Sequence, residues 1–221
     1  MGSDVSNETE KRVAAEAAAE LVEDGMVVGL GTGSTVALLL PLLARRSLDL
    51  RCIATSPRTQ EAARNLGLRV EEFDTLDRLD IAIDSADQID PTGWLVKGGG
   101  AAHTREKIVA GAADVFVVIA DSSKEVSALH GPVPLELMTF GLPATVRSLA
   151  PVSLRDVPLS PDGGVIADYL GAVDDPATLA CRFSATAGVV EHGLFAPGMV
   201  TVTLIGRRNT VERTDYGPDR P

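Results

Sequence analysis

The chain has 221 residues, 45% of them hydrophobic, and a net charge of −11 from 20 Lys and Arg against 31 Asp and Glu. This length fits one large domain, or one domain with a small second module, and the acidic balance argues against nucleic acid as a partner because nucleic-acid binders must neutralise phosphate charges. The apolar runs are too short to span a membrane, Met1 opens onto polar residues, and the two separated cysteines fit neither a disulfide framework nor a metal site, so we expect a cytoplasmic protein without a membrane partner.

Strands and helices alternate in the first 130 residues. A capping box over residues 7–10 predicts an amphipathic helix that ends before Gly25, and an apolar strand over 26–30 then leads through a glycine-rich turn into a helix over 36–44. The next strand, over 50–54, precedes a helix with Ser56 as its N-cap and Pro57 in its first turn. Apolar strands at 80–83 and 115–119 flank a helix over 104–112. This order predicts an open, mostly parallel α/β sheet over residues 1–130.

After residue 130 the pattern changes. Prolines become frequent, a hairpin turn is predicted at 162–164, and helices are predicted over 140–150 and 175–185 among strands near residues 135, 152, 165 and 189. We therefore predict a smaller α+β domain over 131–198, a strand within 199–208 that rejoins the first sheet, and a C-terminal tail over 209–221.

The glycine loop, residues 31–35, joins the first predicted strand to a helix. Unpaired N–H groups at the start of a helix bind anions. Ser34 stands where the dinucleotide fingerprint needs glycine, and the Gly-Lys-Ser/Thr of a nucleotide P-loop is missing. The hydroxyls of Thr32, Ser34 and Thr35 suit the phosphate of a small molecule instead. The alternative is an ordinary strand-to-helix turn with a serine N-cap.

Carboxylates and a lysine follow between residues 84 and 106. Asp84 and Asp87 end an apolar strand, which places them at the carboxyl edge of the sheet, where open α/β folds bind ligands. Lys97 precedes three glycines, and Glu106 lies near the start of the next helix. Each residue alone also fits a surface or capping position, but the cluster predicts a proton-transfer site. The three histidines are dispersed without metal-ligand spacing, so we expect no metal.

In order along the chain, these motifs resemble those of the A-type ribose-5-phosphate isomerases. The matching segments are residues 31–35, 55–59, 84–88, 97–100, 105–108, 120–124 and 188–195. The resemblance implies a Rossmann-like domain with a smaller α+β domain. It also implies a cofactor-free aldose–ketose isomerase that interconverts ribose 5-phosphate and ribulose 5-phosphate through an enediolate, and that forms a homodimer or a dimer of dimers.

The same resemblance assigns roles to single residues. Glu106 would be the base, and Asp84, Asp87 and Lys97 would be the other catalytic residues, with Lys97 as a fixed donor to the enediolate oxygen. The residues that would bind the sugar phosphate are Thr32, Gly33, Ser34, Thr35, Ser85, Ala86, Gly98, Gly99, Gly100 and Lys124.

The chain departs from the family pattern at Ser85, Gln88 and His103, where the family has glycine, glutamate and usually leucine. Ser85 adds a side chain where the sugar is expected, and Gln88 removes a charge. An isomerase of a modified pentose phosphate is therefore an alternative. A non-catalytic sugar-phosphate sensor is a second one, less favoured because a sensor has no use for Glu106 and Lys97 together.

Overall fold

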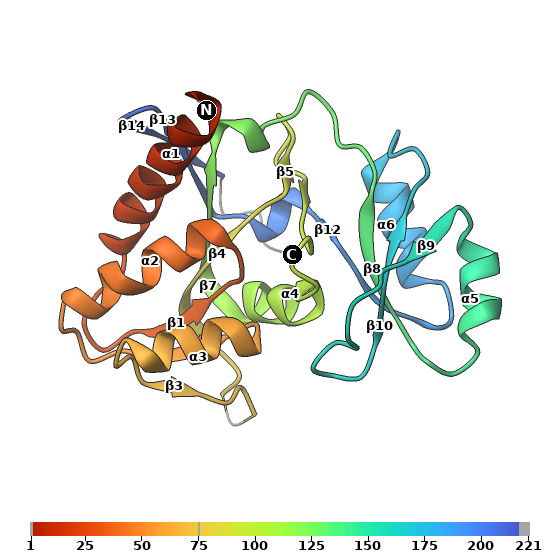
Figure 1. Ribbon diagram of the computed structural model, residues 1–221, viewed down its shortest axis with the longest axis horizontal. Coiled ribbons are helices and arrows are strands. Elements are labelled where there is room, and N and C mark those ends of the chain that lie inside the picture. Colours follow the sequence, from red (N-terminus) through yellow and green to blue (C-terminus); the bar gives the residue numbers. More distant parts are fainter. Residues whose placement is uncertain (1, 75, 217–221) are drawn as a thin grey trace. The chain divides into compact units, whose positions relative to one another are not determined.

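The computed structural model describes residues 2–74 and 76–216, with side chains from residue 7 onward. The chain divides into two compact units (Figure 1). Unit 1 contains the residues up to Ala86, Arg105–Lys124 and those from Gly198 onward, and unit 2 contains Asp87–Thr104 and Glu125–Pro197. The first predicted domain, 1–130, is therefore interrupted, because Asp87–Thr104 forms part of unit 2.

The described residues of unit 1 form a seven-stranded sheet in the order β14-β13-β7-β4-β1-β2-β3. Its strands are β1 (Val27–Leu30), β2 (Arg51–Ala54), β3 (Val70–Glu71), β4 (Leu79–Ser85), β7 (Ala113–Asp121), β13 (Val202–Arg207) and β14 (Thr210–Asp215). Every neighbouring pair is parallel except the hairpin of β13 and β14. The mostly parallel sheet is confirmed, and β13 rejoins it beside β7.

Helices α1 (Gly2–Ala19), α2 (Ser34–Arg45) and α3 (Pro57–Asn65) belong to unit 1, whereas α4 (His103–Ala112) begins in unit 2 and continues in unit 1. Alanines of α1 and leucines of α2 share one apolar core with β1, β4 and β7. The predicted cap of α3 is confirmed, since the Ser56 hydroxyl accepts a hydrogen bond from the Thr59 N–H at 3.2 Å.

Two predictions at the ends of unit 1 were wrong. Helix α1 begins at Gly2, so the predicted capping box lies inside the helix, where Glu10 accepts hydrogen bonds from Ser122 and from the Arg208 N–H. The predicted tail contains β14, whose mostly exposed side chains lack an apolar pattern and whose backbone pairs with β13. Residues 217–221 of that tail lie outside the described residues.

Unit 2 contains a four-stranded antiparallel sheet in the order β11-β8-β10-β9. Its elements are β8 (Val133–Leu137), α5 (Leu142–Leu149), β9 (Val152–Leu154), β10 (Val165–Tyr169), α6 (Pro176–Ser184) and β11 (Val189–His192). Two helices and four strands agree with the predicted α+β region. A core that includes Leu135, Leu149 and Phe183 holds them together.

A second, three-stranded sheet in unit 2 was not predicted. It has the order β12-β6-β5 and consists of β5 (Gln88–Ile89), β6 (Leu95–Val96) and β12 (Leu194–Phe195). Strands of two residues are too short for a hydrophobic period, so only the fold reveals them. The remaining elements are the 3-10 turns η1 (Ser122–Lys124) and η2 (Pro197–Met199). Among the described helices, none has the length and apolar character needed to cross a bilayer.

Candidate active site

The glycine loop lies in unit 1, between β1 and α2. Its Gly31 N–H donates to the Ile83 carbonyl at 2.9 Å, so the loop is tied to β4. A Cβ on Gly31 would lie only 2.0 Å from the Asp84 carboxyl group, and Gly33 has a φ of +139°, a conformation that favours glycine. Gly33, rather than a serine, is the N-cap of α2, and within the described residues no side chain caps it. The first N–H groups of α2 are therefore available for an anion.

Threonines from the neighbouring βα unit support this loop. The Thr59 hydroxyl donates to the Gly31 carbonyl at 2.9 Å, and the Thr32 and Thr55 hydroxyl oxygens are 2.9 Å apart. Thr55 also donates to the Leu30 carbonyl at 3.3 Å. The segment 55–59 thus holds the glycine loop from the side of β2.

Asp84 lies at the carboxyl end of β4 and is only 3% exposed. Its Oδ1 accepts hydrogen bonds from the N–H groups of Thr32 at 3.0 Å and Ser85 at 2.7 Å. The Ser85 hydroxyl donates in turn to the Thr32 carbonyl at 3.0 Å. Asp84 and Ser85 therefore meet the glycine loop, and the hydroxyl that departs from the family pattern has a partner inside the protein.

Two further predicted residues of unit 1 are Glu106 and Lys124. Glu106 is in the first turn of α4 and 3% exposed. Lys124 is half-buried and ends η1, directly after β7. Because β1, β4 and β7 are parallel neighbours, the glycine loop, Asp84 and the turn that carries Lys124 all lie at the carboxyl edge of the sheet.

The other predicted residues come together in unit 2, where residues 97–100 form the segment we call the Lys97 loop. The Gly99 N–H donates to Asp87 Oδ2 at 2.7 Å, and the Asp87 N–H donates to the Val96 carbonyl at 2.8 Å. Lys97 is 2% exposed, with its Nζ 5.4 Å from the centre of the Phe195 ring, within range of a cation–π interaction. Gly100 is exposed beside Gly99, and Ala86, buried in unit 1, leads the chain into Asp87.

Two departures from the family pattern have contacts in unit 2. Gln88 Nε2 donates to the His130 carbonyl at 2.9 Å, and the His130 N–H donates to Gln88 Oε1 at 2.9 Å. A glutamate could only accept, so the amide suits this contact better. His103 is fully buried beside Gly98, and a Cβ on Gly98 would lie 2.7 Å from the His103 Nδ1.

Sequence reasoning missed Arg155, whose guanidinium contacts the Gly98 and Gly99 carbonyls. No local signal could have found it, because 56 residues separate Arg155 from Gly99.

The described residues contain no group of three or more His, Cys, Asp or Glu side chains arranged to hold a metal ion.

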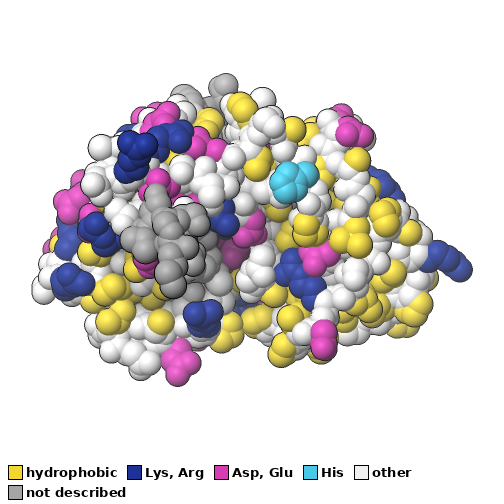
Figure 2. All heavy atoms as spheres, turned by 45° about the horizontal axis from the view of Figure 1, so that its top comes forward, with side chains coloured by type: hydrophobic (Ala, Val, Ile, Leu, Met, Phe, Trp, Pro, Cys, Tyr) yellow, Lys and Arg dark blue, Asp and Glu magenta, His cyan; other side chains and the backbone are white. Residues whose placement is uncertain are grey.

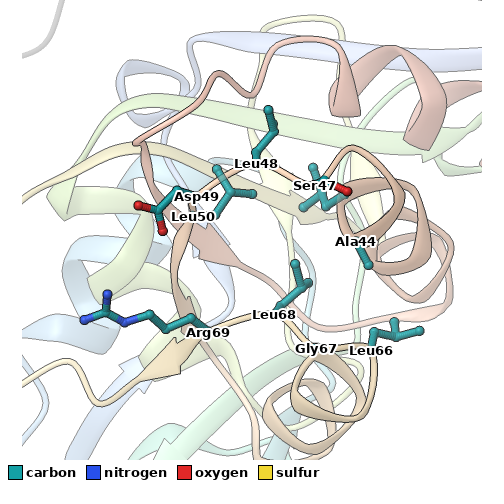
Figure 3. Close-up of a pocket in the computed structure, with 10 residues that line it drawn as sticks. Ala44, Ser47, Leu48, Asp49, Leu50, Leu66, Gly67, Leu68 and Arg69 are labelled. Atoms are coloured by element: carbon teal, nitrogen blue, oxygen red, sulfur yellow. The ribbon is translucent and has the colours of Figure 1, made fainter.

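A pocket of about 200 Å³ lies elsewhere in unit 1 (Figure 3). Mostly aliphatic side chains from the ends of α2 and α3 line it, together with Asp49 and Arg69. These residues precede the amino ends of β2 and β3, and none of them is a predicted site residue.

Comparison with known proteins agrees with this arrangement. Residues 51–210 match the family model of ribose 5-phosphate isomerase A (phosphoriboisomerase A). A curated ribose-5-phosphate isomerase A from Rhodopseudomonas palustris (strain HaA2) is 43% identical over 231 residues, which cover 95% of this chain and 100% of the relative. The ribose 5-phosphate isomerase A structure from Methanocaldococcus jannaschii has a TM-score of 0.88 and 34% identity, covering 93% of this chain and 98% of its own.

A second solved structure is a D-ribose-5-phosphate isomerase in complex with phospho-erythronic acid. It has a TM-score of 0.89 and 32% identity, and the match covers 95% of this chain and 99% of that one. Both the sequence match and the structural match extend over nearly the whole chain. The chain belongs to the ribose 5-phosphate isomerase A family.

Proposed function

We propose that this chain interconverts ribose 5-phosphate and ribulose 5-phosphate, with Glu106 as the base. The observation that carries the proposal is the combination, in unit 1, of an uncapped helix N-terminus at the glycine loop with Asp84 held against that loop. Family membership supports the substrate. The ligand of the related structure, phospho-erythronic acid, joins a phosphate to a carboxylate, and the charged oxygens of the carboxylate resemble the negative oxygen of an enediolate.

The phosphate binds at the glycine loop in this proposal. The first N–H groups of α2 lie at the N-terminus of the helix, which carries a partial positive charge. The hydroxyls of Thr32, Ser34 and Thr35 add hydrogen-bond donors. Gly33, at the N-cap, lets the backbone approach the phosphate closely. Lys124 contributes a positive charge that would attract the phosphate.

Glu106 carries the proton in this mechanism. It removes the C2 proton of open-chain ribose 5-phosphate, the electrons form the enediolate, and the proton returns at C1 to give ribulose 5-phosphate. Lys97 stabilises the negative oxygen of the intermediate. Asp84 and Asp87 assist ring opening and the transfer of hydroxyl protons, and Ser85, Ala86 and residues 98–100 line the sugar.

The test is the formation of ribulose 5-phosphate from ribose 5-phosphate by the purified protein. Glu106→Gln should lower kcat by about 10²- to 10⁴-fold while KM stays within a few-fold, because loss of a base acts on the transition state more than on ground-state binding. Glu20→Gln, at an exposed glutamate of unit 1, is the matched control and should leave kcat unchanged. A Glu106→Gln protein with half the normal kcat would remove Glu106 from this role.

The proposed reaction needs no metal, since Lys97 supplies the charge that stabilises the intermediate. Isomerisation should therefore persist after exhaustive dialysis against EDTA. Activity that is lost with EDTA and restored by a divalent ion would overturn this part of the proposal.

A modified pentose phosphate is less favoured as the substrate. The side chains that raised this alternative, Ser85 and Gln88, bond to Thr32 and His130 of the protein itself. A panel of pentose and deoxypentose phosphates tests the choice, and ribose 5-phosphate should give the highest kcat/KM.

The protein acts as a homodimer or a dimer of dimers in this proposal. Of the nine large hydrophobic side chains that are exposed among the described residues, seven lie in unit 2, where hydrophobic surface is visible in Figure 2. They are Met138, Phe140, Leu154, Val157, Leu159, Leu170 and Val190. Apolar side chains gathered in one unit are typical of an interaction surface. Sedimentation should give two or four times the 23.1-kDa chain mass, and a single-chain mass would contradict it.

We place this activity in the cytoplasm, where a reducing environment suits the free thiols of Cys52 and Cys181.

A further inference from the structure

An arginine from a distant part of unit 2 holds the Lys97 loop. Arg155 directly follows β9, and its N–H donates to the Ile166 carbonyl of β10 at 2.9 Å. Its guanidinium Nη1 donates to the carbonyls of Gly98 at 2.9 Å and Gly99 at 3.2 Å. A side chain thus bonds Gly98 and Gly99 to the four-stranded sheet, in addition to the main-chain bond from the Lys97 N–H to the Gly193 carbonyl at 2.8 Å.

Asp168 on β10 fixes the orientation of this guanidinium. Arg155 Nε donates to Asp168 Oδ2 at 2.7 Å, and Nη2 donates to Oδ1 at 2.6 Å. Both side chains are 18% exposed. A bidentate pair sets the plane of a guanidinium, so the remaining Nη1 is directed toward the glycine carbonyls.

The peptide group between Gly98 and Gly99 is held on both sides. Its carbonyl oxygen accepts from Arg155, and its N–H donates to Asp87. A positive charge that binds the carbonyl also strengthens the N–H as a donor, because hydrogen bonds in a chain polarise one another. Asp168, Arg155, this peptide group and Asp87 therefore form one continuous chain of hydrogen bonds.

We propose that Arg155, oriented by Asp168, is a positioning residue that holds the Lys97 loop and, through the Gly98–Gly99 peptide, Asp87. The proposal rests on the proposed function, in which Lys97 and Asp87 take part in the reaction. Main-chain bonds also restrain the loop, since the Lys97 N–H donates to the Gly193 carbonyl at 2.8 Å and the Ala101 N–H donates to the Gly98 carbonyl at 3.0 Å. Glycine has more backbone freedom than any other residue, so a run of three glycines gains from a further restraint. Arg155 adds that restraint, and it also binds the Gly99 carbonyl.

The kinetic test compares variants at Arg155 with a matched ion pair in unit 1. Arg155→Ala should lower kcat about 10- to 100-fold with KM within a few-fold, since small misplacements of catalytic groups have effects of this size. Arg155→Lys should lie in between, because an ammonium cannot bind Asp168 in bidentate fashion and reach both carbonyls. Arg51→Ala removes a similar bidentate pair with Glu71 and should leave kcat unchanged.

Chemical rescue separates positioning from a purely structural role. Millimolar guanidinium chloride should raise the kcat of Arg155→Ala in a saturable way, with sodium chloride as the salt control and no effect on the parent protein. In a double-mutant cycle, Asp168→Asn should add little to Arg155→Ala, because both act through one contact. Wild-type kcat in Arg155→Ala, or a loss that guanidinium does not restore, would overturn the proposal.

A readout that needs no substrate keeps this inference distinct from the proposed function. Amide hydrogen exchange over residues 97–100 should be faster in Arg155→Ala than in the parent protein and in Arg51→Ala, because the loop loses the bonds from Arg155 to the Gly98 and Gly99 carbonyls. Unchanged exchange there would overturn the positioning role. A parent protein that exchanges as expected but does not convert ribose 5-phosphate would overturn the proposed function alone.

Discussion

The two units hold their candidate site residues by different means. In unit 1, the glycine loop and Asp84 lie at the carboxyl ends of buried parallel strands, and main-chain N–H groups bind the carboxylate directly. In unit 2, the Lys97 loop follows the two-residue strand β6. The side chains of Asp87 and Arg155 bind Gly98 and Gly99, in addition to main-chain bonds at Lys97 and Gly98. The register of a parallel sheet positions the first set. The second set depends on side chains that are distant in sequence, so substitutions far from the loop should affect it.

A pair of glycine substitutions should show this difference most strongly. Gly31→Ala places a Cβ 2.0 Å from the buried Asp84 carboxyl group, which main-chain bonds hold in place, and it should lower the free energy of unfolding by about 3 kcal/mol. Gly99→Ala places a Cβ 2.8 Å from the carboxylate of Asp87, whose exposed side chain can move. It should change stability little and reduce kcat.

Chemical denaturation and steady-state kinetics of both variants measure the two effects. Gly111→Ala is the control, because a Cβ there meets nothing within 4 Å and alanine favours the helix. Equal losses of stability at positions 31 and 99 would remove the distinction between the units.

Acid should weaken another carboxylate contact of unit 1. The Ser122 hydroxyl, together with the N–H groups of Ser122 and Arg208, holds the pKa of the Glu10 carboxyl below its ordinary value, despite the opposing effect of burial. A lowered pKa in the folded state stabilises the fold above the unfolded pKa of about 4.3, and this stabilisation is lost as the pH falls through the folded value.

Glu10→Gln should lower the free energy of unfolding by about 1.5 kcal/mol at pH 7. This value is at the low end of the range for hydrogen bonds to a charged group, because the glutamine side-chain oxygen can still accept a hydrogen bond. The difference from the parent protein should shrink toward pH 3. Urea denaturation at the two pH values checks this, and a difference independent of pH would contradict the role of the carboxylate charge.

The smallest expected effect concerns Ser85. Ser85→Gly removes the hydrogen bond to the Thr32 carbonyl, which is worth about 1 kcal/mol. Because Thr32 belongs to the glycine loop that binds the phosphate in this proposal, the KM for ribose 5-phosphate should rise by a few-fold. Relative kcat/KM values across pentose and deoxypentose phosphates should stay the same, since the hydroxyl bonds to the protein. A changed order of substrates would show that the Ser85 hydroxyl bonds to the sugar instead of to Thr32.

Local patterns predict most of unit 1. The patterns that predict unit 1 each extend over only a few residues: apolar runs, the Ser56–Pro57 cap and the glycines at helix starts. The sequence alone therefore predicts most strands and helices of unit 1 and the position of Asp84 at a strand end. The start of α1 and strand β14 could not be predicted from such patterns. The role of Glu10 depends on Ser122 and Arg208, and β14 depends on its pairing with β13, so in both cases the partners are not given by a local pattern.

Unit 2 shows the same limit within the candidate site. The residue types of the Lys97 loop mark it as a ligand-binding segment, but its conformation depends on Arg155 and Asp168, which no local pattern connects to it. The sequence pattern alone places the side chains at positions 85 and 88 near the sugar. Their bonds to Thr32 and His130 become visible only in the folded chain.

Solvent deuterium incorporation tests the central claim, proton transfer by Glu106 through an enediolate, most directly. The parent protein and Glu106→Gln are incubated with ribose 5-phosphate in D₂O, and proton NMR follows C2 of ribose 5-phosphate and C1 of ribulose 5-phosphate. The account predicts deuterium at these carbons with the parent protein, and incorporation and isomerisation slower by at least about 10²-fold with Glu106→Gln. Incorporation and isomerisation by Glu106→Gln at half the parent rate or more would contradict it.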